Sequence, residues 1–520
     1  MQPFRSFKIT SYHFLFCLVL ILGILARVWG FGVLPAGMAK DEAMIGVDAY
    51  TLFHYGVDRF GNSYPVHLSS YGTGQNVLYA YLLIPFIAIR DLTPLVVRLP
   101  MLIVGILSLP LLYIIARHIS DRKYALIAMF LLAINPWHIV LSHWALESNL
   151  LPFVFMIGFA FLLKSRRHNW GFVLACLFFG LCYYAYGTAY VAVTIFMVAV
   201  VIIVLWFQRV SRKNLVLGMV VFILVALPIG LFVMVNLFHW DTLHLGPVTF
   251  PRLPGNERWT EVSVVSGNRQ NQSLVGNLIG LAGVLWSGSD RLASNSVEPY
   301  GYFYPYIILV ALIGLFMLIK QRKSENTPDR LMLISWFAAA IVIGIMQHPV
   351  NLNRINLIFI PLILFIAVVL AWMENNLNIV FIGSVCALLV GFVFFNRDYH
   401  GEAYRQATRK IFYADLIPAL IFARGIGQGP ICVTGEIGQP YIFALFAERM
   451  DPGEYIDSIV YRGGELDEVL SLGRYTFGIE NCSKDRDTIY VLSGGRSPDE
   501  SIGHKTIIFK DFQVLFPKEK

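Results

Sequence analysis

Charged residues are scarce in this 520-residue chain. Asp, Glu, Lys and Arg make up only 14% of it, whereas 57% is hydrophobic and the mean hydropathy is +0.64. A soluble globular domain carries about 25% charged residues. The composition therefore argues against a soluble protein and predicts an α-helical polytopic membrane protein.

Several recognisable motifs are also missing. The sequence has no internal repeat, no low-complexity tract, no phosphate-binding glycine loop and no paired metal-binding motif. Its first apolar run, residues 11–34, is too long for the core of a signal peptide and has no convincing small-residue cleavage site. We therefore expect this run to be a retained membrane span.

The six cysteines show no metal-ligand spacing. Four lie in apolar runs and are expected to be core thiols: Cys17, Cys176, Cys182 and Cys386. The other two, Cys432 and Cys482, lie in a polar tail. They are able to pair if the tail is outside the cytoplasm, but the sequence does not show that they meet.

Apolar runs long enough to cross a membrane recur about eleven times. They are 11–34, 99–117, 124–142, 149–163, 170–187, 189–208, 215–238, 301–319, 331–348, 355–372 and 378–395. One further run, 77–89, would be roughly 20 Å long as a helix. We expect it to lie at the outer interface as a re-entrant or amphipathic helix, and an extra crossing near 90–98 would raise the count to about thirteen.

Basic residues mark every second connection between these spans, which predicts the orientation of the chain. The clusters are Arg5 and Lys8; Arg117, Arg122 and Lys123; Lys164, Arg166 and Arg167; Arg209, Arg212 and Lys213; and Lys320, Arg322, Lys323 and Arg330. We therefore expect a multi-pass protein of the cytoplasmic membrane with its N-terminus inside. The large polar segments, 35–76, 143–148, 240–300 and the tail, then fall outside.

Two domains are predicted, a transmembrane domain over 1–395 and a soluble extracytoplasmic α/β domain over 396–520. Strand-like runs at 431–435, 488–494 and 505–509 alternate in the tail with helix-like stretches such as 438–449. The tail has 15 Lys and Arg against 18 Asp and Glu, so the basic excess of the chain belongs to the membrane part. That distribution reports topology rather than a nucleic-acid partner.

Acidic residues stand at the outer ends of the spans, whereas the spans themselves are expected to hold no charged side chain. The latter counts against a proton- or sodium-coupled transporter. Asp41, Glu42 and Asp48 follow the first span in MAKDEAMIGVDAY, and Glu147 lies in SHWALES. Acids in such loops are usually solvated, and Asp48 is expected to be either a solvated or a helix-supporting residue. We expect the loops of Asp41 and Glu147 to meet over one outward cavity.

The other polar and aromatic candidates have two possible roles each. His143 is expected to be a hydrogen-bonding interface residue rather than a metal ligand. The aromatic groups 183–190 and 298–306 fit an interfacial belt better than a substrate contact. Arg354 begins a span and would face either headgroups or a bound phosphate.

The order of several motifs resembles that of a known family. DEA follows the first span, VVRLP opens the next, ARHISDRK ends it, INPWHIVLSHWALES forms the following outer turn, and a polar tail closes the chain. This pattern is similar to the C-type membrane glycosyltransferases over roughly residues 10–395. Within them it looks most like the polyprenyl-phosphate-sugar-dependent group, which includes protein O-mannosyltransferases and the lipid A aminoarabinose transferases.

The resemblance implies a polyprenyl-phosphate sugar donor whose lipid lies among the helices and whose phosphosugar lies in an outward cavity. It makes Asp41 the catalytic base, with Glu147 and Glu42 as supporting acids. Many relatives have Asp at the position of Ser148, so the role of Glu147 is less directly transferred. The resemblance also implies inversion without a metal, although a divalent cation between Asp41 and Glu147 stays open.

A departing phosphate needs nearby cations and hydrogen-bond donors. The candidates for binding it or the substrate are Arg354, Arg269, Arg258, Arg59, His143 and Tyr71. The sugar and the acceptor, which is a protein, a glycan or a lipid, are not determined by the sequence. A lipid or glycolipid transporter and a noncatalytic scaffold of envelope assembly are the two alternative functions.

Overall fold

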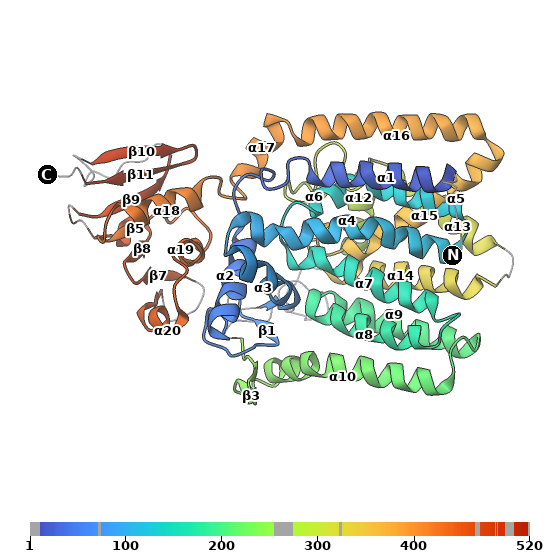
Figure 1. The fold of residues 1–520 in the computed structure, drawn as a ribbon, viewed down its shortest axis with the longest axis horizontal. Helices are drawn as coiled ribbons and strands as arrows, with labels where there is room; N and C mark the ends of the chain where they lie inside the picture. Colours follow the sequence, from blue (N-terminus) through green and yellow to red (C-terminus); the bar gives the residue numbers. More distant parts are fainter. Residues whose placement is uncertain are drawn as a thin grey trace, which may run out of the picture.

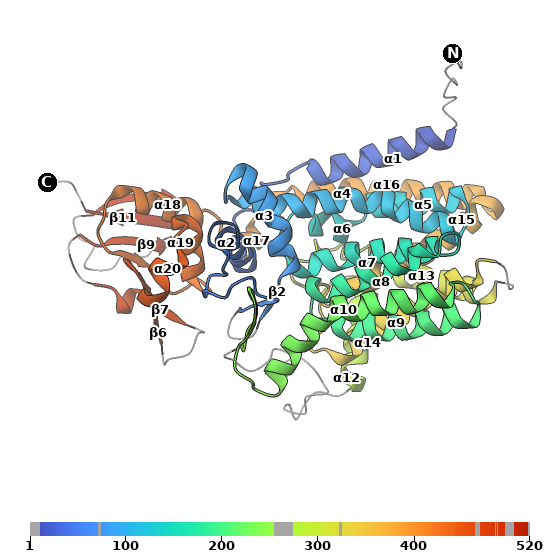
Figure 2. The same cartoon turned by 60° about the horizontal axis from the view of Figure 1, so that its bottom comes forward.

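The computed structural model describes residues 11–70, 74–253, 274–321, 325–462, 468–483, 485, 487–494 and 504–517. A bundle of helices from the first 399 residues lies beside a smaller region built around a sheet (Figure 1). Turning the molecule shows the same separation of bundle and sheet, with α2 and α17 between them (Figure 2).

Eight helices of the described residues are long and apolar enough to cross a membrane. They are α1 (Ser11–Val28), α4 (Pro94–Ile119), α7 (Glu147–Lys164), α9 (Ala189–Trp206), α10 (Arg212–Leu237), α14 (Thr327–Met346), α15 (Phe359–Asn376) and α16 (Asn378–Tyr399). Shorter apolar helices in the bundle are α3 (Leu78–Arg90), α8 (Trp170–Ala185), α12 (Leu274–Ser287) and α13 (Ile307–Lys320). The predicted helical membrane architecture is confirmed, with eight candidate spans among the described residues where about eleven to thirteen were predicted.

Three predicted boundaries differ from the structure. The run 124–142 is not one span but α5 (Arg122–Ala133) and α6 (Pro136–Leu141), because Pro136 interrupts the backbone ladder and Asn135 caps the second helix. The predicted span 301–319 becomes helical only at Ile307. The predicted outer loop 240–300 contains α12, whose apolar residues pack against α14.

The run 77–89 forms helix α3, which packs against α2 (Lys40–Tyr55) and α4. Its position at a membrane interface stays a prediction. Two of the expected core thiols, Cys176 and Cys182, are buried, but Cys17 and Cys386 are exposed on the bundle surface. Cys17 and Cys386 lie on helices whose surface faces away from the bundle. An apolar sequence context therefore did not mean that a cysteine is buried inside the protein.

The expectation of spans without charged side chains is wrong at Arg27, which lies in the predicted span 11–34. This residue of α1 is fully buried, and its guanidinium donates to the carbonyls of Gly23 (2.8 Å) and Leu132 (2.9 Å) and to Nδ1 of His138 (2.8 Å). It thereby satisfies carbonyl groups at the end of α5, where the chain turns toward α6. The hydrogen bonds explain how a cation is accommodated there.

The basic loops meet at one end of the bundle. Ion pairs join Lys123 to Glu374 (2.9 Å) and Arg209 to Asp329 (2.7 Å), and Arg166 pairs with Glu325. Figure 1 shows the α4–α5 connection at the end of the bundle away from the sheet. The predicted cytoplasmic loops therefore share one face, as the topology requires, while the orientation itself stays a prediction.

The tail forms a seven-stranded mixed sheet with strand order β10-β11-β9-β5-β8-β7-β6. The strands are β5 (Ile431–Val433), β6 (Val460–Tyr461), β7 (Val469–Leu472), β8 (Tyr475–Phe477), β9 (Ile489–Ser493), β10 (Lys505–Phe509) and β11 (Phe512–Phe516). Its helices are α17 (Glu402–Arg409), α18 (Leu416–Ile426), α19 (Pro440–Glu448) and α20 (Pro452–Tyr455). The three predicted strands and the predicted helix are all present, and Cys432 and Cys482 form a disulfide.

The tail is docked on the bundle rather than tethered at a distance. Helix α19 packs against α2, the guanidinium of Arg449 pairs with Asp91, and the hydroxyl of Tyr455 donates to the carbonyl of Arg59 (2.7 Å). Two short hairpins lie in the bundle loops: β1 (His67–Leu68) with β2 (Gln75–Asn76), and β3 (Leu243–Leu245) with β4 (Val248–Phe250).

Candidate active site

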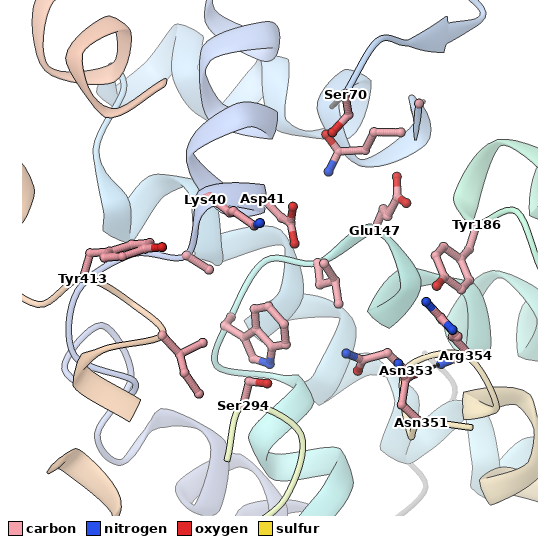
Figure 3. A pocket seen from close by; sticks show the side chains of 16 residues that line it. Lys40, Asp41, Ser70, Glu147, Tyr186, Ser294, Asn351, Asn353, Arg354 and Tyr413 are labelled. Carbon is pink, nitrogen blue, oxygen red and sulfur yellow. Dashed lines mark hydrogen bonds between the residues drawn. The ribbon is translucent and has the colours of Figure 1, made fainter. Parts of the chain in front are cut away.

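A polar pocket of about 310 Å³ lies where α2, α7, the turn before α15 and the start of the tail meet. Asp41, Glu147 and Arg354, three of the predicted site residues, all line it. Figure 3 shows Asp41 and Glu147 near each other, Arg354 and Tyr186 on the side of Glu147, and Lys40 and Tyr413 on the side of Asp41. The structure therefore brings together the acids of two loops with two basic residues, Lys40 and Arg354.

Asp41 stands in the first turn of α2. The backbone N–H groups at a helix N-terminus favour a negative charge there. The same turn is closed by a capping interaction in which the backbone N–H of Ala39 donates to Oε2 of Glu42 (2.9 Å). The start of the helix therefore fixes the backbone from which Asp41 reaches the pocket.

Glu42 has a different place from the one predicted for a catalytic helper. Its carboxylate is fully buried and does not line the pocket; it accepts from Nε and Nη2 of Arg98, both at 2.8 Å, and from the backbone N–H of Ala145 (2.8 Å). Arg98 also donates to the carbonyls of Pro35 (2.9 Å) and Gly37 (2.8 Å). Glu42 is thus a structural link between the segments before Asp41 and before Glu147.

Glu147 is the first residue of α7 and is nearly buried. Its Oε2 accepts the backbone N–H of Asn76 in β2, whose side-chain amide in turn donates to the carbonyl of Tyr183 (2.8 Å) and the hydroxyl of Tyr190 (3.1 Å). The β1–β2 hairpin therefore orients this carboxylate at the edge of the pocket.

Arg354 lies in the turn between α14 and α15. Its guanidinium donates to the carbonyls of His348 (3.3 Å) and Pro349 (3.1 Å). A residue of another segment stabilises the turn, because Asp290 accepts a hydrogen bond from the backbone N–H of Leu352 (2.8 Å). These bonds keep a cation at the pocket wall.

A second cavity of about 440 Å³ adjoins the first. The two share Gly74, Glu147, Tyr186 and Arg354, and the second is otherwise lined largely by apolar side chains of α10 and α14 such as Phe232, Leu237, Ile343 and Met346. His67 also lines it, stacked on the ring of Phe232, and burial lowers the pKa of His67 to about 4. The imidazole is therefore neutral at physiological pH.

Arg59 does not reach either cavity. Its guanidinium is buried in an ion pair with Asp48 and also donates to the carbonyl of Ser69. Asp48 is consequently buried and paired, so the expectation of a solvated residue is wrong and that of a helix-supporting one agrees with the contacts. Burial raises the pKa of Asp48, and Arg59 opposes that shift.

His143 is buried and also lies outside both cavities. Its Nε2 shares a hydrogen bond with the carbonyl of Arg27 (2.8 Å), and its Nδ1 with the hydroxyl of Tyr399 (2.7 Å). Burial lowers the pKa of His143 to about 3. It is therefore a neutral residue that joins α1, α6 and α16. Tyr71, Arg258 and Arg269 lie outside the described residues.

Sequence reasoning did not select several residues of the pocket wall. Lys40 adjoins Asp41, Tyr186 belongs to an aromatic group that was assigned to an interfacial belt, and Asn351 and Asn353 flank the turn of Arg354. Proximity to a selected residue was an available signal for Lys40 and the two asparagines. Tyr413 carries no local signal, because only the docking of the tail brings it to the pocket.

Across the described ranges, no group of three or more His, Cys, Asp and Glu residues has the geometry of a metal site. Asp41 and Glu147 are the two carboxylates that line the pocket. Oxygen ligands suit Mg²⁺ or Ca²⁺, but a cation held by this pair would take most of its ligands from water or substrate. The donor set is therefore incomplete on the protein side.

Comparisons with known proteins agree with this architecture. Residues 18–244 match the family model of dolichyl-phosphate-mannose-protein mannosyltransferases. ArnT from Cupriavidus metallidurans bound to undecaprenyl phosphate has a similar fold, with a TM-score of 0.59 and 14% identity over 98% of each chain. No curated protein sequence matches the chain significantly.

The archaeal oligosaccharyltransferase AglB from Archaeoglobus fulgidus, in complex with an inhibitory peptide and a dolichol-phosphate, aligns with a TM-score of 0.52 and 13% identity over 94% of this chain and 70% of AglB. The apo form of the oligosaccharyltransferase from the same organism aligns with a TM-score of 0.51 and 14% identity, and this chain spans 64% of the length of that enzyme. The protein is thus a multi-pass membrane protein with the C-type glycosyltransferase fold. More particularly, its resemblance to the polyprenyl-phosphate-dependent group, first visible in the motif order, agrees with the mannosyltransferase family model, which matches less than half of the chain.

Proposed function

We propose that this protein is a glycosyltransferase that moves a sugar from a polyprenyl phosphate to an acceptor hydroxyl at the outer face of the cytoplasmic membrane. The observation that carries the proposal is the joining of two cavities: a polar pocket with two acids and two basic residues, and an apolar cavity between helices. An amphipathic donor needs both environments. The orientation follows from the basic loops gathered at the opposite end.

The lipid chain of the donor occupies the apolar cavity, and its phosphate lies where the two cavities meet, beside Arg354 and Tyr186. A guanidinium there stabilises the negative charge of the departing phosphate. The sugar then lies in the polar pocket, next to Glu147 and Asp41.

Asp41 acts as the general base. It takes the proton of the acceptor hydroxyl while the oxygen attacks the anomeric carbon and the bond from that carbon to the phosphate oxygen breaks. Figure 3 shows Asp41 between Tyr413 and Arg354, and so set apart from the guanidinium along the pocket. This separation favours attack from the face opposite the leaving phosphate, so we propose inversion at the anomeric carbon. Arg354 supplies the charge stabilisation in this mechanism, and no metal takes part.

The experiment is a comparison of Asp41→Asn with Asp241→Asn in the purified full-length protein. Asp241 is an exposed acid of another loop and serves as the matched control. We expect Asp41→Asn to lower transfer about 10² to 10⁴-fold, the contribution of a general base, with unchanged affinity for undecaprenyl phosphate. Full transfer by Asp41→Asn would show that Asp41 is not the base.

Donor binding is tested separately with Arg354→Gln. If the phosphate lies at Arg354, this variant loses affinity for undecaprenyl phosphate, whereas Asp41→Asn does not. Equal affinity of the wild type and Arg354→Gln for undecaprenyl phosphate would show that the phosphate does not bind at this end of the pocket.

A further inference from the structure

The wall of the polar pocket that lies away from Arg354 belongs to the tail. Ile411 and Tyr413, in the turn after α17, line the pocket together with residues of the bundle. We infer that the segment 411–413 completes the catalytic centre: Phe412 positions the two loops that carry the acids, while Ile411 and Tyr413 bind the acceptor. The second part rests on the proposed function.

Phe412 contacts the segment that leads to Asp41. Its carbonyl accepts the backbone N–H of Met38 (2.5 Å), three residues before the acid. Gly37 adopts a φ of +86°, and a Cβ there would lie 2.1 Å from the carbonyl oxygen of Phe412. Only glycine therefore permits this close approach of the two backbones.

The ring of Phe412 contacts the second acid-bearing loop. It is almost fully buried and packs edge-on against Trp144, with ring centroids 5.4 Å apart. Leu146, directly before Glu147, packs against the same cluster. Phe412 thus touches both loops, through its carbonyl on the side of Asp41 and through its ring on the side of Glu147. Removal of the ring would loosen the spacing of Asp41 and Glu147 without touching either carboxylate.

Tyr413 is held in a conformation that a non-glycine residue rarely adopts, with a φ of 43°. Its hydroxyl accepts the backbone N–H of Gly438 (2.9 Å), which ties the turn to the loop before α19. Strained backbone of this kind persists where surrounding contacts over-determine it, and it gathers at ligand sites. Figure 3 shows the ring beside Lys40, across the pocket from Arg354.

The arrangement of the two cavities indicates which side of the polar pocket receives the donor and which side receives the acceptor. None of Lys40, Ile411 and Tyr413 lines the apolar cavity; among the described residues, Gly74, Glu147, Tyr186 and Arg354 line both cavities. A donor that enters from the apolar cavity therefore reaches the pocket at the far side from the tail. Asp41 lies between, so the acceptor hydroxyl that it deprotonates comes from the side of Ile411 and Tyr413.

The test uses the full-length protein and separates acceptor from donor. The donor is the polyprenyl-phosphate-sugar extract of cells that lack this chain, and the acceptor is the envelope fraction of the same cells. We expect Ile411→Ala and Tyr413→Ala each to raise the half-saturating amount of acceptor about tenfold, as the loss of one productive side-chain contact does. Affinity for undecaprenyl phosphate should fall less than affinity for the acceptor, because the donor enters from the other side of the pocket. The slow transfer of sugar to water is measured in parallel.

The matched control is Ile508→Ala, because Ile508 is exposed on β10 and lines neither cavity. Tyr413→Phe keeps the ring, so it should retain most of the acceptor binding that Tyr413→Ala loses. Phe412→Ala lowers the maximal rates of transfer and of hydrolysis together, about 100-fold, as expected when acids are displaced by about 1 Å. Phe412→Leu should be faster than Phe412→Ala, because it keeps a large apolar side chain. If Phe412→Ala does not fold, the Tyr413 variants still test the inference.

Unchanged acceptor saturation in Ile411→Ala and Tyr413→Ala would overturn the inference, as would an equal loss of undecaprenyl phosphate affinity in both. Under either result the wild type still binds the lipid and transfers sugar, so the proposed function stands. A wild type that neither binds undecaprenyl phosphate nor transfers sugar would overturn the proposed function and the inference with it.

Discussion

The buried pair of Glu42 and Arg98 is expected to dominate the stability of the site. The Glu42 carboxylate accepts two hydrogen bonds from Arg98 and one each from Ala39 and Ala145, all at 2.8–2.9 Å, and both charged side chains are at most 1% exposed. Glu42→Gln leaves the guanidinium buried without its counter-ion. Breaking one side of such a pair costs about 3–5 kcal/mol of the free energy of unfolding.

The assay is denaturant unfolding of the purified protein in micelles, as a double-mutant cycle with Arg98→Met. We expect Glu42→Gln/Arg98→Met to be less destabilised than the sum of the single variants, because the double variant buries no unpaired charge. Glu374→Gln is the matched control. Its partner Lys123 is 39% exposed, so this substitution should cost less than about 1 kcal/mol.

Two results would refute the reasoning about this pair. The first is additive destabilisation across the cycle, within about 0.5 kcal/mol. The second is full transfer activity in folded Glu42→Gln, because the carboxylate holds the backbone just before Asp41 and just before Glu147. Loss of activity in the folded fraction would instead support a positioning role for Glu42.

Two other predictions concern pH and metal. The buried His67 has a pKa of about 4 against an ordinary 6.5, so its contribution to stability is fully present above pH 6.5 and is lost as the pH falls toward 4, by up to about 3 kcal/mol. The stability difference between wild type and His67→Phe should therefore change in that window, and a pH-independent difference would contradict the assignment. Chelation with EDTA should leave transfer unchanged; loss of activity that Mg²⁺ or Mn²⁺ restores would instead place a cation between Asp41 and Glu147.

The site was only partly predictable, and the adjacent acids of α2 show why. Successive helical residues point about 100° apart, so Asp41 and Glu42 face different surroundings. Asp41 lines the pocket, whereas Glu42 faces Arg98 on α4. The sequence contains both acids but not the rotation of the helix against its neighbours. The roles of Asp41, Glu147 and Arg354 in catalysis stay predictions, although their meeting in one pocket agrees with them.

Arg59 and His143 illustrate the same limit. Each is a polar residue in a predicted outer loop, and such residues are usually exposed. In the structure each is buried with its partners, Asp48 for Arg59 and Tyr399 for His143. Tyr399 lies 256 residues from His143 in the chain. No local pattern indicates a hydrogen bond over such a separation.

The sequence by itself determined that this is a helical membrane protein with a sheet-containing tail, and where most of its helices and three of its strands lie. Those features follow from local composition, because apolar length and residue periodicity set the type of each element. Only the tertiary structure decided which charged residues reach the pocket and that Ile411 and Tyr413 of the tail form its wall. A charged group takes its role from the partners that surround it, and here packing brings those partners from distant parts of the chain.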